Sequence, residues 1–344
     1  ETTIAAMGEN LLAGWNDTKG FCTGGAVQAF AWSTNRGASW TDVGDMPPPP
    51  TGARYRGDPV HAVDRLTGDF YALGLCEGGS SGSGLALLRG HFAGGTFVID
   101  DNRQIAVGGA NFIDKEWMDI DSNPADPAHP WIYITYSNFV GGSISQIELI
   151  VSNDKGLTWS APQVLNSAAT NGWVQGSRPV VGPDGELYVV WYEADLPSHM
   201  RIARSNDHGA TFGPVRTACD FYENYASGAP GFRRGRSVTL PGLAVDKSGD
   251  PFRGRVYVTW DESVNFYDAP FPVSPSPKSE VEVNGFFASA TPFTVGDLLR
   301  GGFSTTADID HFVFSGTRGQ TLVFSSDSAS GVVVNARIVC AADT

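Results

Sequence analysis

Charged residues and long apolar runs are both scarce in this sequence. Charged side chains make up 17% of the 344 residues, and 37 acidic residues against 23 basic ones leave a net charge of −14. An acidic surface repels the phosphate backbone, so we expect no nucleic-acid partner. No run of 18 apolar residues is present, and we therefore expect no membrane-spanning helix. The 42 glycines, 21 prolines and 11% aromatic residues instead favour a compact, turn-rich, all-β protein.

Cysteine and histidine are scarce too. The four cysteines lie too far apart for a CxxC redox or zinc motif, and the six histidines form no HExxH pattern. An even number of cysteines among glycine-rich loops favours disulfides and an oxidising compartment, with four unrelated thiols as the alternative. The chain begins ETTIAAMGEN without an initiator methionine, as a processed mature protein or a trimmed fragment would. We expect a secreted or cell-surface protein.

The strongest signal is a short motif that recurs along the chain. In SNDKGLTWS, a serine, an aspartate, a glycine and a tryptophan stand at positions i, i+2, i+4 and i+7. Asn and Asp bond back to nearby amides and Gly accepts positive φ, so the motif predicts a β-hairpin turn. A degenerate copy, GHFAGGTF, keeps only Gly94 and Phe97. The residues of the three good copies are Ser33, Asn35, Gly37 and Trp40; Ser152, Asp154, Gly156 and Trp159; and Ser205, Asp207, Gly209 and Phe212.

A second pattern accompanies these hairpins. It consists of a short apolar strand, a turn, and a strand that ends in an aromatic residue. The pattern begins at Gly57, Asp114, Ser177 and Leu240, and the opening GENLLAGWND supplies the second half of a further copy. A strand pair followed by a hairpin, repeated at a regular spacing, predicts the four-stranded blades of a β-propeller.

The hairpin motif matches the Asp box of sialidase-like, or BNR-repeat, proteins, and residues 1–270 resemble that superfamily. The resemblance implies a six-bladed propeller in which each Asp box joins the third and fourth strands of a blade, away from the catalytic face. About five blades are visible of the expected six. A Pro/Ser-rich linker at residues 271–278 follows the fifth blade start, and no Asp box comes after it. Either the chain is a fragment or another domain interrupts the fifth blade.

Residues 279–344 resemble a different family, the bacterial pre-peptidase C-terminal (PPC) domain, and stop before that domain would end. The resemblance implies a small β-sandwich attached to a secreted bacterial protein, with a calcium site like that of related collagen-binding domains. Alternate residues of a strand share one face, and Ca²⁺ prefers carboxylate and amide oxygens. Solvated strand ends are the alternative interpretation of the same residues. The predicted ligands are Glu280, Glu282, Asn284, Asp308 and Asp310.

A second oxygen-rich segment, DIDSNPADP from Asp119, is a further candidate for a calcium loop.

The propeller resemblance also implies where chemistry would take place. In sialidases the substrate lies over the propeller axis, where three arginines hold its carboxylate, a Tyr–Glu pair supplies the nucleophile and an Asp acts as acid/base. The family's N-terminal F/Y-R-I-P motif is absent here, and no last-blade tyrosine is found. Residues at the starts of innermost strands point towards that axis. They supply the substrate-binding candidates Arg56, Arg178 and Arg236 and the catalytic candidates Asp58, Asp114 and Glu116.

These observations favour a secreted propeller that binds a glycan or a cell-surface or other extracellular partner. An exo-glycosidase of the sialidase type, acting on the axial face, is the first alternative. A structural subunit of an extracellular assembly is the second, because this fold hosts many activities.

One disulfide is predicted between Cys22 and Cys76. Each cysteine follows the second strand of its blade, and equivalent loops of neighbouring blades lie side by side, so a short Cα separation is attainable. Cys219 and Cys340 are left as a second pair.

Overall fold

The computed structural model divides the chain into two compact units, unit 1 (Glu1–Ser263) and unit 2 (Val264–Thr344). Within the described residues, no helix is long and apolar enough to cross a membrane. The structure describes residues 2–79, 82–105, 109–124, 126, 128–141, 144–166, 173–195, 198–221, 240–260, 278–279, 289–293, 299–300 and 312–313.

Unit 1 contains four antiparallel four-stranded sheets, each built from strands consecutive in the sequence. Sheet 1 consists of β1 (Thr2–Met7), β2 (Asn10–Asn16), β3 (Gln28–Ser33) and β4 (Thr41–Asp45). Sheet 2 consists of β5 (Arg54–Val63), β6 (Phe70–Gly78), β7 (Gly82–Ala93) and β8 (Thr96–Ile105). Sheet 3 consists of β9 (Phe112–Asp121), β10 (Trp131–Gly141), β11 (Ile144–Ser152) and β12 (Gln163–Val164).

The series continues with a fourth and a partial fifth sheet. Sheet 4 consists of β13 (Val174–Val181), β14 (Leu187–Glu193), β15 (Ser198–Ser205) and β16 (Arg216–Phe221). Sheet 5 has two described strands, β17 (Gly242–Val245) and β18 (Val256–Thr259). A short helix, α1 (Thr18–Thr23), interrupts sheet 1, and Asp17 caps its N-terminus by accepting a hydrogen bond from the Lys19 amide at 2.9 Å.

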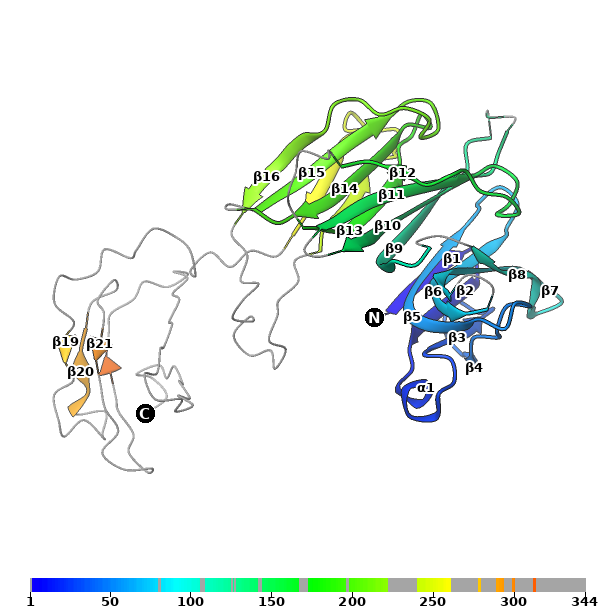
Figure 1. Ribbon diagram of the computed structural model, residues 1–344, viewed down its shortest axis with the longest axis horizontal. Helices are drawn as coiled ribbons and strands as arrows, with labels where there is room; N and C mark the ends of the chain where they lie inside the picture. The colour runs from blue at the N-terminus through cyan, green and yellow to red at the C-terminus, as the bar shows by residue number, and fades with distance from the viewer. Residues whose placement is uncertain are drawn as a thin grey trace. The chain divides into compact units, whose positions relative to one another are not determined.

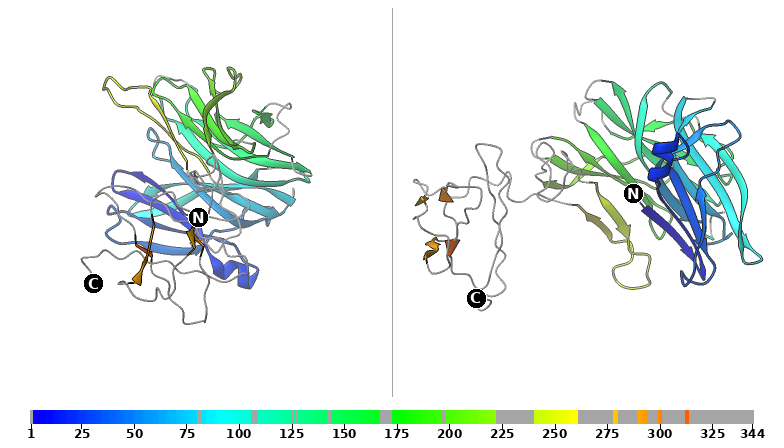
Figure 2. Two further views of the ribbon diagram at one scale, coloured as in Figure 1. Left: turned by 90° about the vertical axis from the view of Figure 1, so that its left-hand side faces the viewer. Right: turned by 90° about the horizontal axis from the view of Figure 1, so that it is seen from below.

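The sheets are arranged as the blades of a propeller (Figures 1 and 2). The first strands β1, β5, β9, β13 and β17 contact one another in that order, so they are the innermost strands. The predicted all-β propeller and its five blade starts are confirmed, with four complete blades and a partial fifth among the described residues. One detail differs: the opening segment supplies both the first and the second strand of sheet 1, because β1 precedes GENLLAGWND.

Each pair of neighbouring sheets encloses its own apolar core. Ile132, Ile134 and Tyr136 of β10 face the core shared with sheet 2, whereas Tyr133, between them, faces the core shared with sheet 4. Successive side chains of a strand point to opposite faces, so a strand between two blades must be apolar on both. This requirement explains the nearly continuous apolar sequence WIYITY of β10.

The three good copies of the hairpin motif form the same turn. In the third copy, Ser205 Oγ donates to Asp207 Oδ1 at 2.7 Å and accepts a hydrogen bond from the Gly209 amide at 2.9 Å. Asp207 also accepts from the Thr211 amide and hydroxyl, at 2.8 and 2.5 Å. Equivalent bonds hold the copies that begin at Ser33 and Ser152. The hairpins join the third and fourth strands of sheets 1, 3 and 4, as predicted.

Strand direction alternates within each sheet, so the two ends of the propeller are different. The connections from first to second strand and from third to fourth strand lie at one end, which we call the turn end. The innermost strands begin at the opposite end, which we call the bulge end, for the β-bulges described below.

The predicted disulfide between Cys22 and Cys76 is not formed, and both side chains are free thiols. Cys22 is exposed on α1, whereas Cys76 lies within β6 and is buried in the core between sheets 1 and 2. The prediction placed Cys76 in a loop after the strand, but the strand continues to Gly78 and turns this side chain inwards. Cys340 lies outside the described residues, so the pairing of Cys219 with Cys340 stays a prediction.

Unit 2 is described only at four short strands. β19 (Lys278–Ser279) pairs in parallel with β21 (Leu299–Arg300), and β20 (Thr291–Pro292) pairs in parallel with β22 (Phe312–Val313). The predicted calcium ligands Glu280, Glu282, Asn284, Asp308 and Asp310 lie outside the described residues, as does most of the predicted linker. The sandwich and its calcium site therefore stay predictions.

Candidate functional site

The inner strands β5, β9 and β13 share an irregularity near their starts. In each, the register against the second strand of the sheet shifts, which marks a β-bulge. Each bulge contains residues with positive φ: Gly57 (φ 116°) and Asp58 (φ 54°) in β5, Lys115 (φ 53°) in β9 and Gly176 (φ 66°) in β13. A bulge re-aims side chains, and left-handed backbone costs a non-glycine residue about 1–3 kcal/mol. Contacts from elsewhere must therefore hold Asp58 and Lys115 in place.

Those contacts come from neighbouring sheets. Lys115 Nζ lies 2.7 Å from Asp58 Oδ2, which joins sheet 3 to sheet 2. Asn16, at the end of β2, accepts a hydrogen bond from the Asp58 amide at 2.8 Å. A Cβ on Gly57 would lie 2.9 Å from Asn16 Oδ1, so this close approach requires glycine. Gln175 of sheet 4 donates to Asp114 Oδ2 at 2.7 Å. Four sheets thus contribute to one polar cluster at the bulge end.

Two carboxyl groups of this cluster have raised pKa values. Burial is the main cause for Asp114, the charge of Asp58 adds to it, and Lys115 opposes it, which leaves a pKa of about 6. Glu116 is 2% exposed, and its pKa lies well above the ordinary value, again chiefly because of burial and then because of Asp58. Neither carboxylate oxygen of Glu116 has a hydrogen-bond partner of good geometry within the described part of the chain.

The cluster therefore holds carboxyl groups in different electrostatic surroundings. Asp58 forms an ion pair with the ammonium group of Lys115, whereas burial and the charge of Asp58 raise the pKa of Glu116. Asp114 changes its protonation state near pH 6, in the range that suits a general acid or base. Carboxyl groups whose environments separate their pKa values are typical of acid–base catalytic sites.

A cavity of about 760 Å³ lies between the inner strands, closer to the turn end. Residues of β1, β5 and β9 line it, among them His61 and Trp117. Thr3 Oγ1 donates to the Pro59 carbonyl at 3.0 Å, so it can accept a hydrogen bond from His61 Nδ1, which lies 2.7 Å away. Burial lowers the pKa of His61 to about 3. His61 Nε2 is then an acceptor, and it has no hydrogen-bond partner among the described residues.

The structure brings together the three catalytic candidates Asp58, Asp114 and Glu116 but places the arginines differently. Arg56 Nε pairs with Glu77 at 2.8 Å and is partly exposed. The guanidinium of Arg178 lies 3.4 Å from the centre of the Trp117 ring. Arg56 precedes its bulge residue by two positions and Arg178 follows its own by two, so the two are not equivalent. Arg236 lies outside the described residues.

Sequence reasoning placed Lys115 at the start of an inner strand without giving it a role, and it did not select Asn16, Gln175 or His61. The one local signal was position: Lys115 and Gln175 stand at the start of an inner strand, beside residues that were selected. Their partners are distant in the sequence, so no motif could reveal them.

Comparison with known proteins identifies no family: no family model and no curated protein matches the chain. Several solved structures resemble part of it. A protein of unknown function from Dyadobacter fermentans is 18% identical, over 63% of this chain and 68% of that one, with a TM-score of 0.42. The leech intramolecular trans-sialidase is 11% identical, over 63% of this chain and 50% of that one, with a TM-score of 0.45.

The α-L-arabinanase of Penicillium chrysogenum is 13% identical, over 73% of this chain and 71% of that one, with a TM-score of 0.46. The chain thus spans half the length of the trans-sialidase and about two thirds of the other two. Likenesses at this level carry no functional conclusion, which has to come from the site itself.

Proposed function

We propose that the bulge end of unit 1 binds a glycan and cleaves a glycosidic bond by general acid–base catalysis. The observation that carries the proposal is the position of Asp114. Its carboxyl group is half-buried, has a pKa of about 6, and belongs to a cluster that also holds the Asp58 carboxylate, which is in an ion pair with Lys115. Glycoside hydrolysis uses one carboxyl group to protonate the leaving oxygen and a second, ionised one on the other side of the bond.

The proposed roles follow from the surroundings of each group. Asp114 donates the proton, because it is protonated below about pH 6 and is more exposed than Glu116. Asp58 supplies the negative charge that stabilises the oxocarbenium-like transition state or activates water, and its ion pair with Lys115 holds the carboxylate in place. Glu116 is a positioning residue: it is buried, and burial together with the charges of Asp58 and Asp114 raises its pKa.

Glycan binding without cleavage is the second candidate. It is favoured by the 2.7 Å ion pair, in which Asp58 and Lys115 already neutralise each other. A binding site of this kind would use the cluster as a rigid set of hydrogen-bonding groups for sugar hydroxyls.

The experiment is a hydrolysis assay of the full chain on aryl glycosides of sialic acid, arabinose, galactose and glucose, with binding measured on the corresponding oligosaccharides. The proposal expects release of the aryl group, and a loss of at least 100-fold in Asp114→Asn and Asp58→Asn. Asp100→Asn, an exposed acid of β8, is the matched control and should keep wild-type activity. Binding without hydrolysis would support the second candidate, and neither binding nor hydrolysis would contradict both.

A further inference from the structure

In the three good copies of the hairpin motif, the residue before the glycine is basic and lies close to a carboxylate at the turn end. Arg36, Lys155 and His208 all have left-handed backbone, with φ values of 58°, 64° and 56°. Arg36 pairs with Glu9 of its own sheet at 3.5 Å. Lys155 pairs with Asp69 of the preceding sheet at 2.7 Å, and His208 lies 3.3 Å from Asp126 of the preceding sheet.

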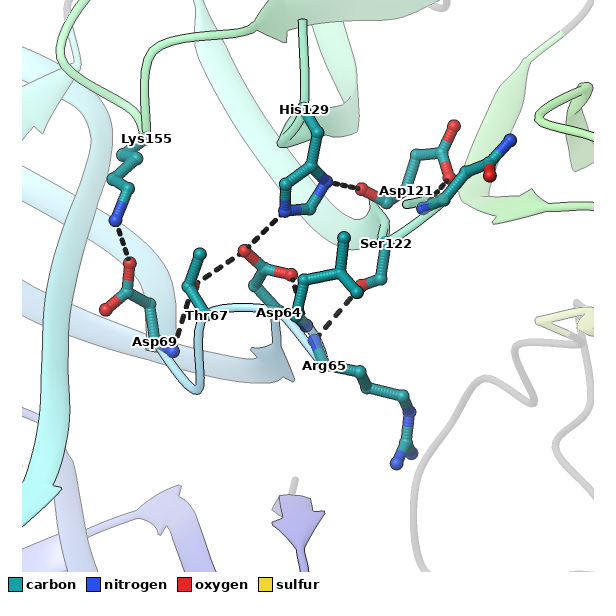
Figure 3. A network of polar contacts seen from close by, with 10 residues as sticks. Asp64, Arg65, Thr67, Asp69, Asp121, Ser122, His129 and Lys155 are labelled. Atoms are coloured by element: carbon teal, nitrogen blue, oxygen red, sulfur yellow. Dashed lines mark hydrogen bonds and ion pairs between the residues drawn. The ribbon is translucent and has the colours of Figure 1, made fainter. Parts of the chain in front are cut away.

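At the junction of sheets 2 and 3, ion pairs and hydrogen bonds between side chains connect the two sheets (Figure 3). Lys155 Nζ reaches Asp69, and His129 bridges Asp64 Oδ2, at 2.9 Å, to the Asp121 carbonyl, at 3.0 Å. Asp64 also accepts hydrogen bonds from the Leu66 amide and the Thr67 hydroxyl, so both its carboxylate oxygens have donors. Lys155 Nζ and both ring nitrogens of His129 have partners as well.

The junction of sheets 3 and 4 differs in its basic residue and in the number of carboxylates near that residue. An imidazole, His208, stands where Lys155 stands in the neighbouring junction, and it faces two carboxylates, Asp121 and Asp126. One ligand atom of each of these three residues lies within 4.8 Å of the other two. Asp121 is 4% exposed; its Oδ1 accepts from the Asn123 amide at 2.9 Å, whereas its Oδ2 is buried without a hydrogen-bond partner among the described residues.

The three side chains are held in place by groups around them. The His208 ring stacks on Trp131, with ring centres 4.2 Å apart and planes within 7°. The hydroxyl of the buried Tyr133 lies 3.3 Å from His208 Nδ1, and Trp131 Nε1 donates to Asp126 Oδ2 at 2.9 Å. In the tautomer that carries its proton on Nδ1 and donates it to Tyr133, the lone pair of His208 Nε2 is directed at the carboxylates. Metal-binding histidines are oriented in this way by the bond at the other nitrogen.

We propose that Asp121, Asp126 and His208 bind a divalent first-row transition ion of the Zn²⁺ type, which fastens sheet 3 to sheet 4. One imidazole and two carboxylates suit such an ion, with further positions filled by water, whereas Ca²⁺ prefers oxygen ligands alone. The ion satisfies Asp121 Oδ2, which is otherwise a buried acceptor without a donor. At this junction the ion would connect the two sheets as the Lys155–Asp69 ion pair connects sheets 2 and 3.

The calcium loop considered for the segment from Asp119 is thereby revised. Asp119 Oδ2 accepts from the Val181 amide at 2.7 Å and is not part of the group. Only Asp121 and Asp126 of that segment converge, and the third ligand comes from a different blade.

The test is a calorimetric titration of Zn²⁺ into the chelator-treated full chain, with melting temperatures measured in parallel. An ion that binds the folded state alone must raise Tm, by roughly 5 °C at a hundredfold excess over Kd. Asp121→Asn should weaken Zn²⁺ binding at least tenfold. Lys155→Ala, at the neighbouring junction, is the control and should leave Zn²⁺ binding unchanged.

His208→Lys separates metal binding from mere structural damage. A lysine there can pair with Asp126 as Lys155 pairs with Asp69, so the metal-free Tm should stay near the wild-type value while the response to Zn²⁺ is lost. Asp126→Asn, which keeps the shape of the side chain, repeats the test should the lysine variant fail to fold. An unchanged Zn²⁺-dependent rise in Tm in these variants, or no saturable binding by the wild type, would overturn the proposal.

Discussion

Aspartates at the two ends of the propeller have opposite properties. At the turn end, Asp207 accepts hydrogen bonds from Thr211 and Ser205, and these lower its pKa to about 2. At the bulge end, burial and the charge of Asp58 raise the pKa of Asp114 to about 6. The turn aspartate receives all its bonds from residues within four positions, whereas Asp114 depends on Gln175 of the next sheet. Asp207 therefore stabilises a local turn, whereas the pKa of Asp114 lies where a carboxyl group gains or loses a proton near pH 6.

Residues with left-handed backbone occur at both ends of the propeller. They belong to local turns at the turn end and are held by contacts from other sheets at the bulge end. At the turn end, Lys155 and His208 are each followed by a glycine with φ near 80° inside a repeated turn. At the bulge end, Asp58 is followed by proline, which favours extended backbone in the residue before it, and contacts from Asn16 and Lys115 hold it. Unfavourable conformation maintained by distant contacts is a feature of functional sites.

The largest expected effect is on catalysis at the bulge end. Asp114→Asn should lower kcat/KM for glycoside hydrolysis by about 10²- to 10⁴-fold, because the amide cannot donate a proton in the same way. In the wild type, activity should fall as pH rises through about 6, where Asp114 loses its proton. A pH–rate profile checks this. Equal activity at pH 5 and pH 8 would show that Asp114 is not the acid.

Asp114→Asn should lower activity but raise the free energy of unfolding at neutral pH. The folded-state pKa of Asp114 is raised from 3.8 to about 6, so the wild type loses stability as pH rises through this window and stays less stable above it. The full shift corresponds to about 3 kcal/mol, the upper limit of the gain expected from Asp114→Asn at pH 7.5.

Urea unfolding at pH 7.5 and at pH 4 measures this gain, which should disappear at the lower pH. A variant less stable than the wild type at pH 7.5 would mean that the carboxylate is stabilised by its partners rather than penalised by burial.

At the turn end, a methyl group on a turn glycine should destabilise the fold without affecting catalysis. Gly209 has a φ of 82°, and a Cβ there would lie 3.0 Å from Leu149 Cδ2. Gly209→Ala should lower the free energy of unfolding by about 1–2 kcal/mol. Gly213→Ala is the matched control, since its φ is ordinary and its Cβ would lie 3.6 Å from the Arg204 carbonyl. Equal stability of the two variants would contradict the role of left-handed backbone in this turn.

The smallest effect is expected from the turn aspartate itself. The pKa of Asp207 is lowered to about 2, so its contribution is present above the unfolded pKa of 3.8 and is lost as pH falls towards 2. Asp207→Asn should lower Tm slightly at pH 6, and the difference should close between pH 4 and pH 2. A difference in Tm that persists at pH 2 would assign the effect to hydrogen bonding rather than charge.

The hairpins could be predicted from the sequence because their bonds are local. Ser152, Asp154 and Gly156 lie within five positions, so the motif contains both the donors and the acceptors of its own turn. The disulfide could not be predicted in the same way. Whether Cys76 faces a loop or the core depends on where β6 ends, and the sequence pattern placed that end too early.

The sequence by itself determined the blades, their order and the positions of Asp58, Asp114 and Glu116 at the starts of inner strands. The alternation of apolar residues and the eight-residue turn motifs involve residues that are close in the sequence. The strands and hairpins that they form can therefore be predicted without knowing the fold. Only the tertiary structure decided which charges meet. Lys115 reaches Asp58 across 57 positions, and His208 reaches Asp126 from the next blade. Charge pairing and burial depend on distances in space; the bulges of β5 and β9 set the distance between Asp58 and Lys115, and the packing of sheet 3 against sheet 4 sets that between Asp126 and His208.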